Sequence, residues 1–405
     1  MEILIYNIIQ FLLYLVGAYL LFNCVYLLFF SVAGHFLKKT PLVLHERFKR
    51  ICVLIPAYRE NEVILASSMR ALSHEYEGFF KIVVIADGLS DDTINTIKNA
   101  GAAVIPVSFV KSTKGKSLNY ALTQIPVNEY DIAVILDIDN IMADGFLSDI
   151  NSAFQEGATV VQAHRTAKNL DSSFAFLDAC NEEINNHIYR KGHFAVGLSP
   201  ALIGSGMAFE FSYLRTLLAN IGETVGEDKE MDFQIAKSKT KIVYLNESLV
   251  YDEKIENAAV FTQQRTRWIA AQIEFFKKYF VAGFAELFKN GNFEFFNKVL
   301  QAMLVPRMLL LGLLFLLSLV SLIFFSGPAS LFYPLLFVIL CFSLFLALPE
   351  RFYKDKRLFS AIFRIPYALW CMVLALLRIK QAKKSFIPTP HTSSSIVEEH
   401  TLQKK

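Results

Sequence analysis

The chain has 405 residues, 54% of them hydrophobic, and a formal net charge of +3. This hydrophobic fraction exceeds the ~45–50% that is typical of soluble domains, and the length allows a catalytic domain of ~250 residues together with membrane segments. The small net charge excludes the strongly basic surface that would favour nucleic acid as a partner, and five cysteines without a CxxC spacing favour neither a disulfide framework nor a zinc site.

Residues 1–37 are predicted to form an uncleaved transmembrane anchor. The apolar run over 3–36 is longer than the core of a signal peptide, and no basic leader precedes it. Lys38 and Lys39 follow this run. Because lysines that flank a span tend to stay on the cytoplasmic side, we expect a multi-pass protein of the inner (cytoplasmic) membrane with a cytoplasmic catalytic domain.

Residues 48–256 alternate short β-branched runs with amphipathic stretches, which is typical of an α/β domain with a mixed, mostly parallel sheet. In open α/β sheets, ligands bind beyond the carboxyl ends of the strands. The polar segments that follow the predicted strands should therefore meet in one crevice. The predicted strands cover 51–58, 81–88, 102–107, 131–139 and 159–165, and helices are predicted to begin near Glu60, Asp91, Lys114 and Gly145.

Asp137 and Asp139 follow a buried apolar run in the sequence VILDIDN. At a spacing of two residues, their side chains project to the same side of an extended chain. Two carboxylates so close repel one another unless a cation lies between them, and Mg²⁺ or Mn²⁺ bridged to phosphates suits such oxygen ligands. The alternative is a polar turn that caps the next helix, but the neighbouring acidic loops favour the metal site.

Two other strand ends carry residues that suit a nucleotide. Asp87, before a glycine, is placed to accept hydrogen bonds from a base or a ribose, whereas Asp91 or Asp92 is expected only to cap the following helix. Tyr58 offers a flat stacking surface and Glu60 a hydrogen-bond acceptor. For this last segment, the alternative is an ordinary helix start.

Lys114 and Lys116 lie near the predicted start of a helix, where positive charge opposes the helix dipole. An anionic ligand would offset this unfavourable interaction, and a solvated loop is the alternative. Further along, Gly204, Ser205 and Gly206 are small enough for the backbone to approach a ligand closely, although they also fit a tight turn before a strand.

Glu227 and Asp228 form a third acidic cluster, at the start of another predicted helix. A carboxylate in this place can accept a proton from an acceptor hydroxyl. Taken alone, the pattern is that of a helix cap; as the third acidic cluster in order, it favours a catalytic role.

Gln264, Arg267 and Trp268 fall at positions i, i+3 and i+4 of a predicted helix and share one face. This combination suits a diphosphate held by the guanidinium and a sugar ring stacked on the indole. An interfacial helix with a Trp/Arg belt is the alternative. Residues 273–300, after this motif, mix Phe with Lys at helical spacing, so the region 257–300 is predicted to form helices on the cytoplasmic membrane surface.

Residues 301–380 are predicted to form a C-terminal transmembrane region. The apolar runs 304–325 and 331–348 are each long enough to span a membrane. A third run, 362–377, is short and carries an arginine and a proline, so it either spans or lies in the interface. Residues 381–405 are predicted to form a polar tail.

These motifs, in this order, resemble those of the membrane-bound, inverting family-2 glycosyltransferases with a GT-A fold, a group that includes cellulose, chitin, hyaluronan and poly-N-acetylglucosamine synthases. IPAYRENE, with Pro56, resembles the opening nucleotide-binding loop, IADGLSDDT the second aspartate motif, KGKSLNYAL the lysine motif on the phosphate side, and LDIDN the metal-binding DxD. GSGMAFE resembles the glycine loop on the acceptor side, GED the TED-type motif with Asp228 as its catalytic base, and QQRTRW the QxxRW motif.

The chain departs from this family at three places. Gly226 replaces the threonine of TED, one N-terminal span stands where several polymer synthases have two, and few C-terminal spans are left to line a secretion channel. Processivity is therefore left open. FIPTPHT, residues 386–392, resembles the cytoplasmic tail of some exopolysaccharide transferases, which favours an interfacial last helix.

The resemblance implies inverting transfer of a sugar from a nucleotide sugar, with UDP as the expected nucleotide, to a glycan or lipid-linked acceptor in polysaccharide synthesis. It also implies a lipid bilayer and export or polymerisation proteins as partners. A polyprenyl-phosphate sugar transferase shares the early motifs but typically lacks QxxRW; a non-catalytic membrane scaffold would be expected to have lost Asp139 or Asp228. The expected donor residues are Pro56, Tyr58, Glu60, Asp87, Lys114, Lys116, Asp137 and Arg267, and the expected acceptor residues are Gly204, Ser205, Gly206, Glu227, Gln264 and Trp268.

Overall fold

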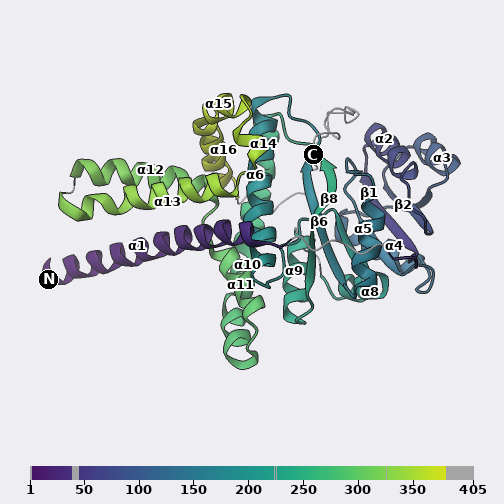
Figure 1. The fold of residues 1–405 in the computed structure, drawn as a ribbon, viewed down its shortest axis with the longest axis horizontal. Helices are drawn as coiled ribbons and strands as arrows, with labels where there is room; N and C mark the ends of the chain where they lie inside the picture. Colours follow the sequence, from purple (N-terminus) through teal and green to yellow (C-terminus); the bar gives the residue numbers. More distant parts are fainter. Residues whose placement is uncertain (1, 39–44, 223, 225, 325, 380–405) are drawn as a thin grey trace.

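A computed structural model describes residues 2–38, 45–222, 224, 226–324 and 326–379. Lys39, the FIPTPHT segment and the predicted polar tail lie outside the described residues. Figure 1 shows an α/β domain on one side and a group of long apolar helices on the other, with further helices between them.

The described residues form one mixed eight-stranded sheet in the order β3-β2-β1-β4-β7-β6-β8-β5. Parallel pairing joins β1 to β2 and β4, β2 to β3, and β6 to β8, whereas β7 is antiparallel to β4 and β6, and β5 to β8. The predicted α/β class with a mixed sheet is confirmed. The strands are β1 (Ile51–Tyr58), β2 (Phe80–Asp87), β3 (Ala103–Val107), β4 (Ile132–Ile135), β5 (Ile141–Met142), β6 (Val160–Ala167), β7 (Met207–Glu210) and β8 (Ile242–Asp252).

Side chains of β1 alternate between two hydrophobic layers, as the period of two requires. Ile51, Val53 and Ile55 pack into one layer, and Cys52 and Leu54 into the other. The first layer is covered by α2 (Asn61–Leu72), α3 (Asp91–Asn99) and α5 (Phe146–Gln155). The second is covered by α4 (Lys114–Gln124), α8 (Phe211–Ala219) and α9 (Glu227–Lys237).

The N-cap of α3 is Ser90, whose hydroxyl accepts a hydrogen bond from the backbone N–H of Thr93. The prediction that Asp91 or Asp92 caps this helix was wrong. Both aspartates lie in its first turn instead, where a negative charge still interacts favourably with the helix dipole.

Several helices lie between the sheet and the apolar helices. The QQRTRW sequence lies in α10 (Ala258–Asn290), so its predicted helical conformation is confirmed. This helix packs against α11 (Phe293–Met303). Another helix of this group, α6 (Ser173–Asn185), continues into a π-helix (Asn186–Gly192), which α7 (His193–Ala195) follows. The short helices α14 (Glu350–Tyr353) and α15 (Arg357–Ile362) lie near α6 (Figure 1).

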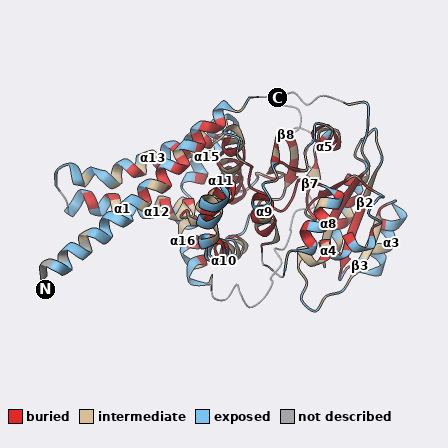
Figure 2. Ribbon diagram, turned by 90° about the horizontal axis from the view of Figure 1, so that it is seen from below, coloured by how far each residue is buried: buried red, intermediate tan, exposed pale blue. Residues whose placement is uncertain are grey.

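Three apolar helical segments project together away from the sheet (Figure 1). Figure 2 colours many of their residues as exposed, and large apolar residues are prominent among these. Over the described residues, these segments are long and apolar enough to cross a membrane. They are α1 (Glu2–Ala33) with η1 (Gly34–Phe36), α12 (Arg307–Phe324), and η3 (Gly327–Leu331) with α13 (Phe332–Ala347). The 13-residue helix α16 (Ile365–Leu377) is about 20 Å long, shorter than a hydrocarbon layer of roughly 30 Å.

The end of α1 docks tightly on the π-helix. His187 Nε2 donates a hydrogen bond to the Ser31 carbonyl oxygen at 2.8 Å, and the Phe30 ring stacks on His193 with centroids 3.6 Å apart. A Cβ atom at Gly192 would overlap the Phe30 carbonyl oxygen. Glycine at this position therefore permits the close approach of two backbones.

We expect Gly192→Ala to destabilise this docking by about 1–3 kcal/mol, because a backbone atom leaves no room for the added methyl group. Thermal unfolding in detergent measures the change. Gly222→Ala is the matched control, since nothing lies within 4 Å of a Cβ there. Equal melting temperatures for the two variants would contradict the tight docking.

Candidate functional site

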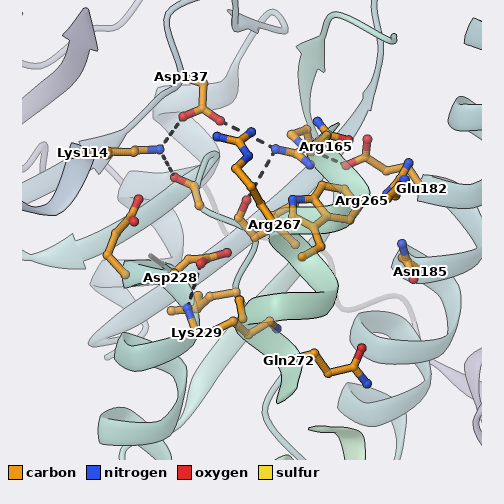
Figure 3. Close-up of a pocket in the computed structure, with 18 of the residues that line it drawn as sticks. Lys114, Asp137, Arg165, Glu182, Asn185, Asp228, Lys229, Arg265, Arg267 and Gln272 are labelled. Atoms are coloured by element: carbon orange, nitrogen blue, oxygen red, sulfur yellow. Dashed lines mark hydrogen bonds and ion pairs between the residues drawn. The ribbon is translucent and has the colours of Figure 1, made fainter. Parts of the chain in front are cut away.

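A cavity of about 880 Å³ lies beyond the carboxyl ends of β1, β2 and β4 and continues between α6, α9 and α10 to the start of α12. The predicted crevice thus brings together the loops after these strands. The cavity is lined by all of the predicted site residues except Lys116, Ser205 and Gly206. Figure 3 shows side chains from the sheet, α9 and α10 pointing toward one another across it.

Asp137 is surrounded by cations at the centre of this cavity. Lys114 Nζ donates one hydrogen bond to Asp137 and another, at 2.6 Å, to the Gly204 carbonyl oxygen. Arg165 lies on the other side of Asp137, with an N···O distance of 3.7 Å (Figure 3). Burial by itself would lower the pKa of Lys114, but the nearby carboxylates of Asp137 and Glu227 raise it, so the side chain stays an ammonium.

Asp139 lies deeper, with 2% of its surface exposed. Its Oδ2 accepts a hydrogen bond from the backbone N–H of Glu253 at 2.8 Å, and its Oδ1 accepts one from Asn140 at 3.3 Å. The bond from Glu253 joins the loop after β4 to the end of β8, so Asp139 helps to fix the backbone on which Asp137 is carried.

The donor set around Asp137 fits a divalent cation that also binds a phosphate. Among the described residues, no group of three or more His, Cys, Asp and Glu side chains is placed to hold a metal by itself. Mg²⁺ usually needs only one or two carboxylates, together with substrate phosphates and water. The Asp137 carboxylate, 32% exposed at the cavity, can supply one such oxygen ligand.

The part of the cavity that the sequence assigns to the nucleotide is formed by the ends of β1 and β2. The Asp87 carboxylate accepts a hydrogen bond from the Ser112 hydroxyl, and Tyr58 lies nearby with the Arg59 guanidinium 5.0 Å from its ring centre. Pro56 and Glu60 line the same part of the cavity. The structure therefore brings together the four residues that the sequence assigned to the nucleotide.

At the start of α9, Glu227 and Asp228 lie beside the glycine loop and α4. The position of a Cβ on Gly204 would be 3.8 Å from both Asp228 Oδ2 and Lys114 Nζ. Burial raises the pKa of Glu227 to about 7, against the opposing effect of the Lys114 ammonium. A Cβ on Gly226 would stand 3.2 Å from the Phe275 ring, so any larger residue in this loop would crowd that ring.

Gln264, Arg267 and Trp268 line the cavity from α10. Figure 3 shows Arg267 extending toward the region of Asp137, and burial lowers the pKa of Arg267, partly offset by the Glu227 carboxylate. Gln264 Oε1 is buried and has no hydrogen-bond partner in the described part of the chain. Trp268 is 46% exposed, and the Arg265 guanidinium covers its ring at 4.1 Å from the ring centre.

Sequence reasoning missed a buried network of opposite charges along one wall of the cavity. Arg165 donates a hydrogen bond to Glu182 at 2.6 Å, and Lys254 pairs with Glu182 and, at 2.7 Å, with Asp252. Burial alone would raise the pKa of Glu182, but the cations Arg165 and Lys254 hold it well below its ordinary value. The only signal in the sequence was the place of Arg165 near the end of a predicted strand.

Three predicted residues lie outside this cavity. Lys116 lines a second, smaller cavity of about 220 Å³, and its Nζ donates to the Lys111 carbonyl oxygen at 3.3 Å. Ser205 and Gly206 form the turn before β7, where the Ser205 hydroxyl lies 3.4 Å from Arg165. The tight turn before a strand, which the sequence offered as an alternative for this glycine loop, is therefore present.

Comparisons with known proteins agree with the α/β fold of this domain. A family model described as "Glycosyltransferase like family 2" matches residues 49–271. No curated protein matches the chain. Among solved structures, the mannosyltransferase PcManGT from Pyrobaculum calidifontis, in complex with GDP-Man and Mn²⁺, is similar with a TM-score of 0.56 at 17% identity, over 92% of this chain and 98% of that chain.

Glucosyl-3-phosphoglycerate synthase from Mycobacterium tuberculosis, in complex with Mn²⁺, UDP and phosphoglyceric acid, is similar over 55% of this chain and 76% of that chain, at 19% identity and a TM-score of 0.38. The family match and the likeness to PcManGT together confirm the GT-A-like fold expected from the sequence.

The raised pKa of Glu227 predicts how stability changes with pH. The folded protein favours the neutral carboxyl group, so the stability that Glu227 contributes is present below its ordinary pKa of 4.5 and is lost as the pH rises through about 7. Glu227→Gln should therefore raise the melting temperature relative to the unmodified protein more at pH 8 than at pH 5.

Thermal unfolding at the two pH values measures this difference, and Glu62→Gln, on an exposed part of α2, is the control. A melting-temperature difference for Glu227→Gln that is the same at both pH values would show that this carboxyl group does not titrate in the window.

Proposed function

The chain belongs to glycosyltransferase-like family 2, and we propose that it transfers a sugar, with inversion, from a nucleotide sugar to an acceptor hydroxyl at a membrane surface. UDP is the proposed nucleotide. One observation carries the proposal: in a single cavity, cations surround the place for a diphosphate, and two carboxylates and a half-exposed Trp268 lie next to it.

The donor occupies the part of the cavity next to the strand ends. Tyr58 stacks on the base, and Asp87 and Glu60 accept hydrogen bonds from the base or ribose, with Pro56 shaping the loop. Lys114, Arg267 and Arg165 bind the diphosphate and stabilise the negative charge that develops when it leaves, because fixed cations in a buried site need no rearrangement during the reaction. Of the two lysines expected on the phosphate side, Lys114 lines this cavity, whereas Lys116 lines the smaller one.

Mg²⁺ or Mn²⁺ would be held by Asp137 together with the donor diphosphate, and when bound it would polarise that leaving group. In the proposal, Asp139 is the second carboxylate of the metal motif and also holds Asp137 in place through its bonds to the end of β8.

The acceptor occupies the opposite side, between α9 and α10. Asp228 is the base that takes the proton from the acceptor hydroxyl as its oxygen attacks the anomeric carbon. Glu227 and the Gly204–Gly206 loop shape this side. Gln264 offers its unpartnered carbonyl oxygen to a sugar hydroxyl, and Trp268 stacks on the sugar ring.

The proposal places the protein in the cytoplasmic membrane, which the three apolar helical segments support. It also places the catalytic domain in the cytoplasm, as the lysines after the first apolar run imply, and gives it a role in polysaccharide synthesis, as the family resemblance implies. The length of α16 favours an interfacial last helix over a third C-terminal span. In this proposal, residues 1–37 form the anchor, 48–256 the transferase domain, 257–300 the interface helices and 301–380 the C-terminal membrane region. Export or polymerisation proteins are the proposed partners.

We expect the detergent-solubilised protein to release nucleoside diphosphate from one member of a panel of UDP-sugars when acceptor and Mg²⁺ or Mn²⁺ are present. Asp228→Asn should lower kcat by about 10² or more with little change in donor affinity, because it removes the proton acceptor and keeps the size of the side chain.

Asp92→Asn is the matched control, since Asp92 is also the second residue of a helix but is exposed and outside the cavity. Release that is insensitive to Asp228→Asn would overturn its role as base, and no release from any nucleotide sugar would overturn the proposed function.

The two aspartates of the DxD motif should differ in their effects. Asp137→Ala should abolish metal-dependent turnover and lower the melting temperature less than Asp139→Ala does, because the Asp137 carboxylate is partly exposed at the cavity. Asp139→Ala should abolish turnover and also lower the melting temperature, since it leaves the Glu253 N–H without its acceptor. Near-normal turnover of Asp139→Ala with Mn²⁺ would contradict the motif's assignment.

A further inference from the structure

The cavity is longer than a nucleotide sugar needs and continues past Trp268 to the beginning of the membrane helices. Its far end is lined by the short connection between α11 and α12 and by a methionine of α16. The side chains there are mostly apolar. They are Ala302, Leu304, Val305, Pro306, Met308 and Met372.

One buried cation stands at this apolar end. Arg307, the first residue of α12, is 8% exposed and lines the cavity. Its Nη2 donates hydrogen bonds to the Asn181 carbonyl oxygen at 3.1 Å and to Asn181 Oδ1 at 2.8 Å. Its Nη1 has no hydrogen-bond partner, and no carboxylate forms an ion pair with it anywhere in the described ranges.

Three neighbouring buried arginines have their partners within the protein. Arg165 pairs with Glu182, and Arg265 pairs with Asp178. Arg190 has no ion pair among the described residues, but it donates to the Ala201 carbonyl oxygen and to Asn186 Oδ1 and leaves no buried nitrogen without a partner. A buried charge without a counter-charge is strongly unfavourable. The unpaired guanidinium beside a cavity therefore indicates an anionic ligand that is not part of the protein.

The position of Arg307 relative to Trp268 follows from α6. Asp178 and Asn181 are three residues apart on this helix, so their side chains share a face. Asp178 holds Arg265, which covers the Trp268 ring, and Asn181 holds Arg307. The two α6 residues that hold these arginines are thus about one helical turn apart, and both arginines line the same cavity as Trp268.

We propose that this end of the cavity binds the phosphate of a lipid-linked glycosyl acceptor, with Arg307 as the phosphate ligand; the proposal rests on the proposed function and names its acceptor class. The lipid chain leaves along the apolar residues toward α12 and α16. The sugar attached to the phosphate stacks on Trp268. Its hydroxyl oxygen bonds to the anomeric carbon of the donor, the bond from that carbon to the diphosphate breaks, Asp228 takes the proton, and nucleoside diphosphate leaves.

Binding to the full chain in nanodiscs of neutral phospholipid tests this site without turnover. The probes are a polyprenyl phosphate, the polyprenol of the same length, and inorganic phosphate. We expect the unmodified protein to bind the polyprenyl phosphate more tightly than either of the other probes. Arg307→Gln should weaken polyprenyl phosphate binding by roughly tenfold or more, the usual effect of losing a charge-assisted hydrogen bond, and leave polyprenol binding unchanged.

Arg364→Gln is the matched control, because Arg364 also stands at the start of an apolar helix but is exposed and outside the cavity. Arg307→Lys keeps the charge and should lose less affinity than Arg307→Gln. If Arg307→Gln does not fold, the affinity of Arg307→Lys and the comparison of the three probes on the unmodified protein still test the phosphate site.

Equal weakening of phosphate and alcohol probes, equal loss in Arg364→Gln, or equal affinity of the unmodified protein for the two lipid probes would overturn the proposal. Inorganic phosphate that binds as tightly as the lipid phosphate would leave an anion site but remove the lipid-linked acceptor. A parallel titration of the unmodified protein with UDP separates the lipid-phosphate site from the proposed function. If the protein binds UDP but not the lipid phosphate, only the inference about the lipid-phosphate site is contradicted. If it does not bind UDP, the proposed function is contradicted.

Discussion

The buried ion pairs between the sheet and α6 are the interaction on which the rest of this structure depends. Arg165 at the end of β6 and Lys254 just after β8 both pair with Glu182 of α6. Removing one member of a buried pair typically costs about 3–5 kcal/mol, because the remaining charge is left without compensation. The pairs fix α6 against the sheet, and α6 in turn holds Arg265 of α10 and Arg307 of α12 through Asp178 and Asn181. The separation between the sheet and the helices α10 and α12, which line the cavity, is therefore fixed by α6.

The same network sets the electrostatics at the donor site. Asp137 lies between Lys114 and Arg165, so two cations and one carboxylate meet where a diphosphate is proposed to bind. Glu182 and Asp252 pair with Arg165 and Lys254. These ion pairs offset the unfavourable burial of the two cations, so both cations remain charged. Lys114 and Arg267 are two further cations that line this cavity. A leaving diphosphate would meet charge that is already in place, which is the condition for electrostatic stabilisation of a transition state.

Local patterns predicted the local parts of this arrangement well. The strand 51–58 and the α4 start at Lys114 have the predicted boundaries because alternation and helix-start signals are properties of neighbouring residues. The Arg265–Asp178 pair joins residues 87 positions apart, and no local pattern carries that information. Lys116 is a different case: it is two positions from Lys114 on one helix, and residues at this spacing do not share a face. Helical geometry alone therefore allowed only one of these lysines at the cavity.

The helix that carries the proposed base is fastened to the helices that lead into the apolar region. Lys298 of α11 pairs with Asp232 of α9 at 2.9 Å, with both side chains buried, and Lys278 of α10 pairs with Glu230 of α9 at 2.7 Å. Only the connection Leu304–Pro306 separates the end of α11 from the start of α12. If the apolar helices are embedded as proposed, any movement of α12 in the bilayer acts directly on α11 and, through these ion pairs, on α9. The membrane would then set the height of Asp228 above the lipid surface, and with it the length of the head group that can present a hydroxyl to the donor.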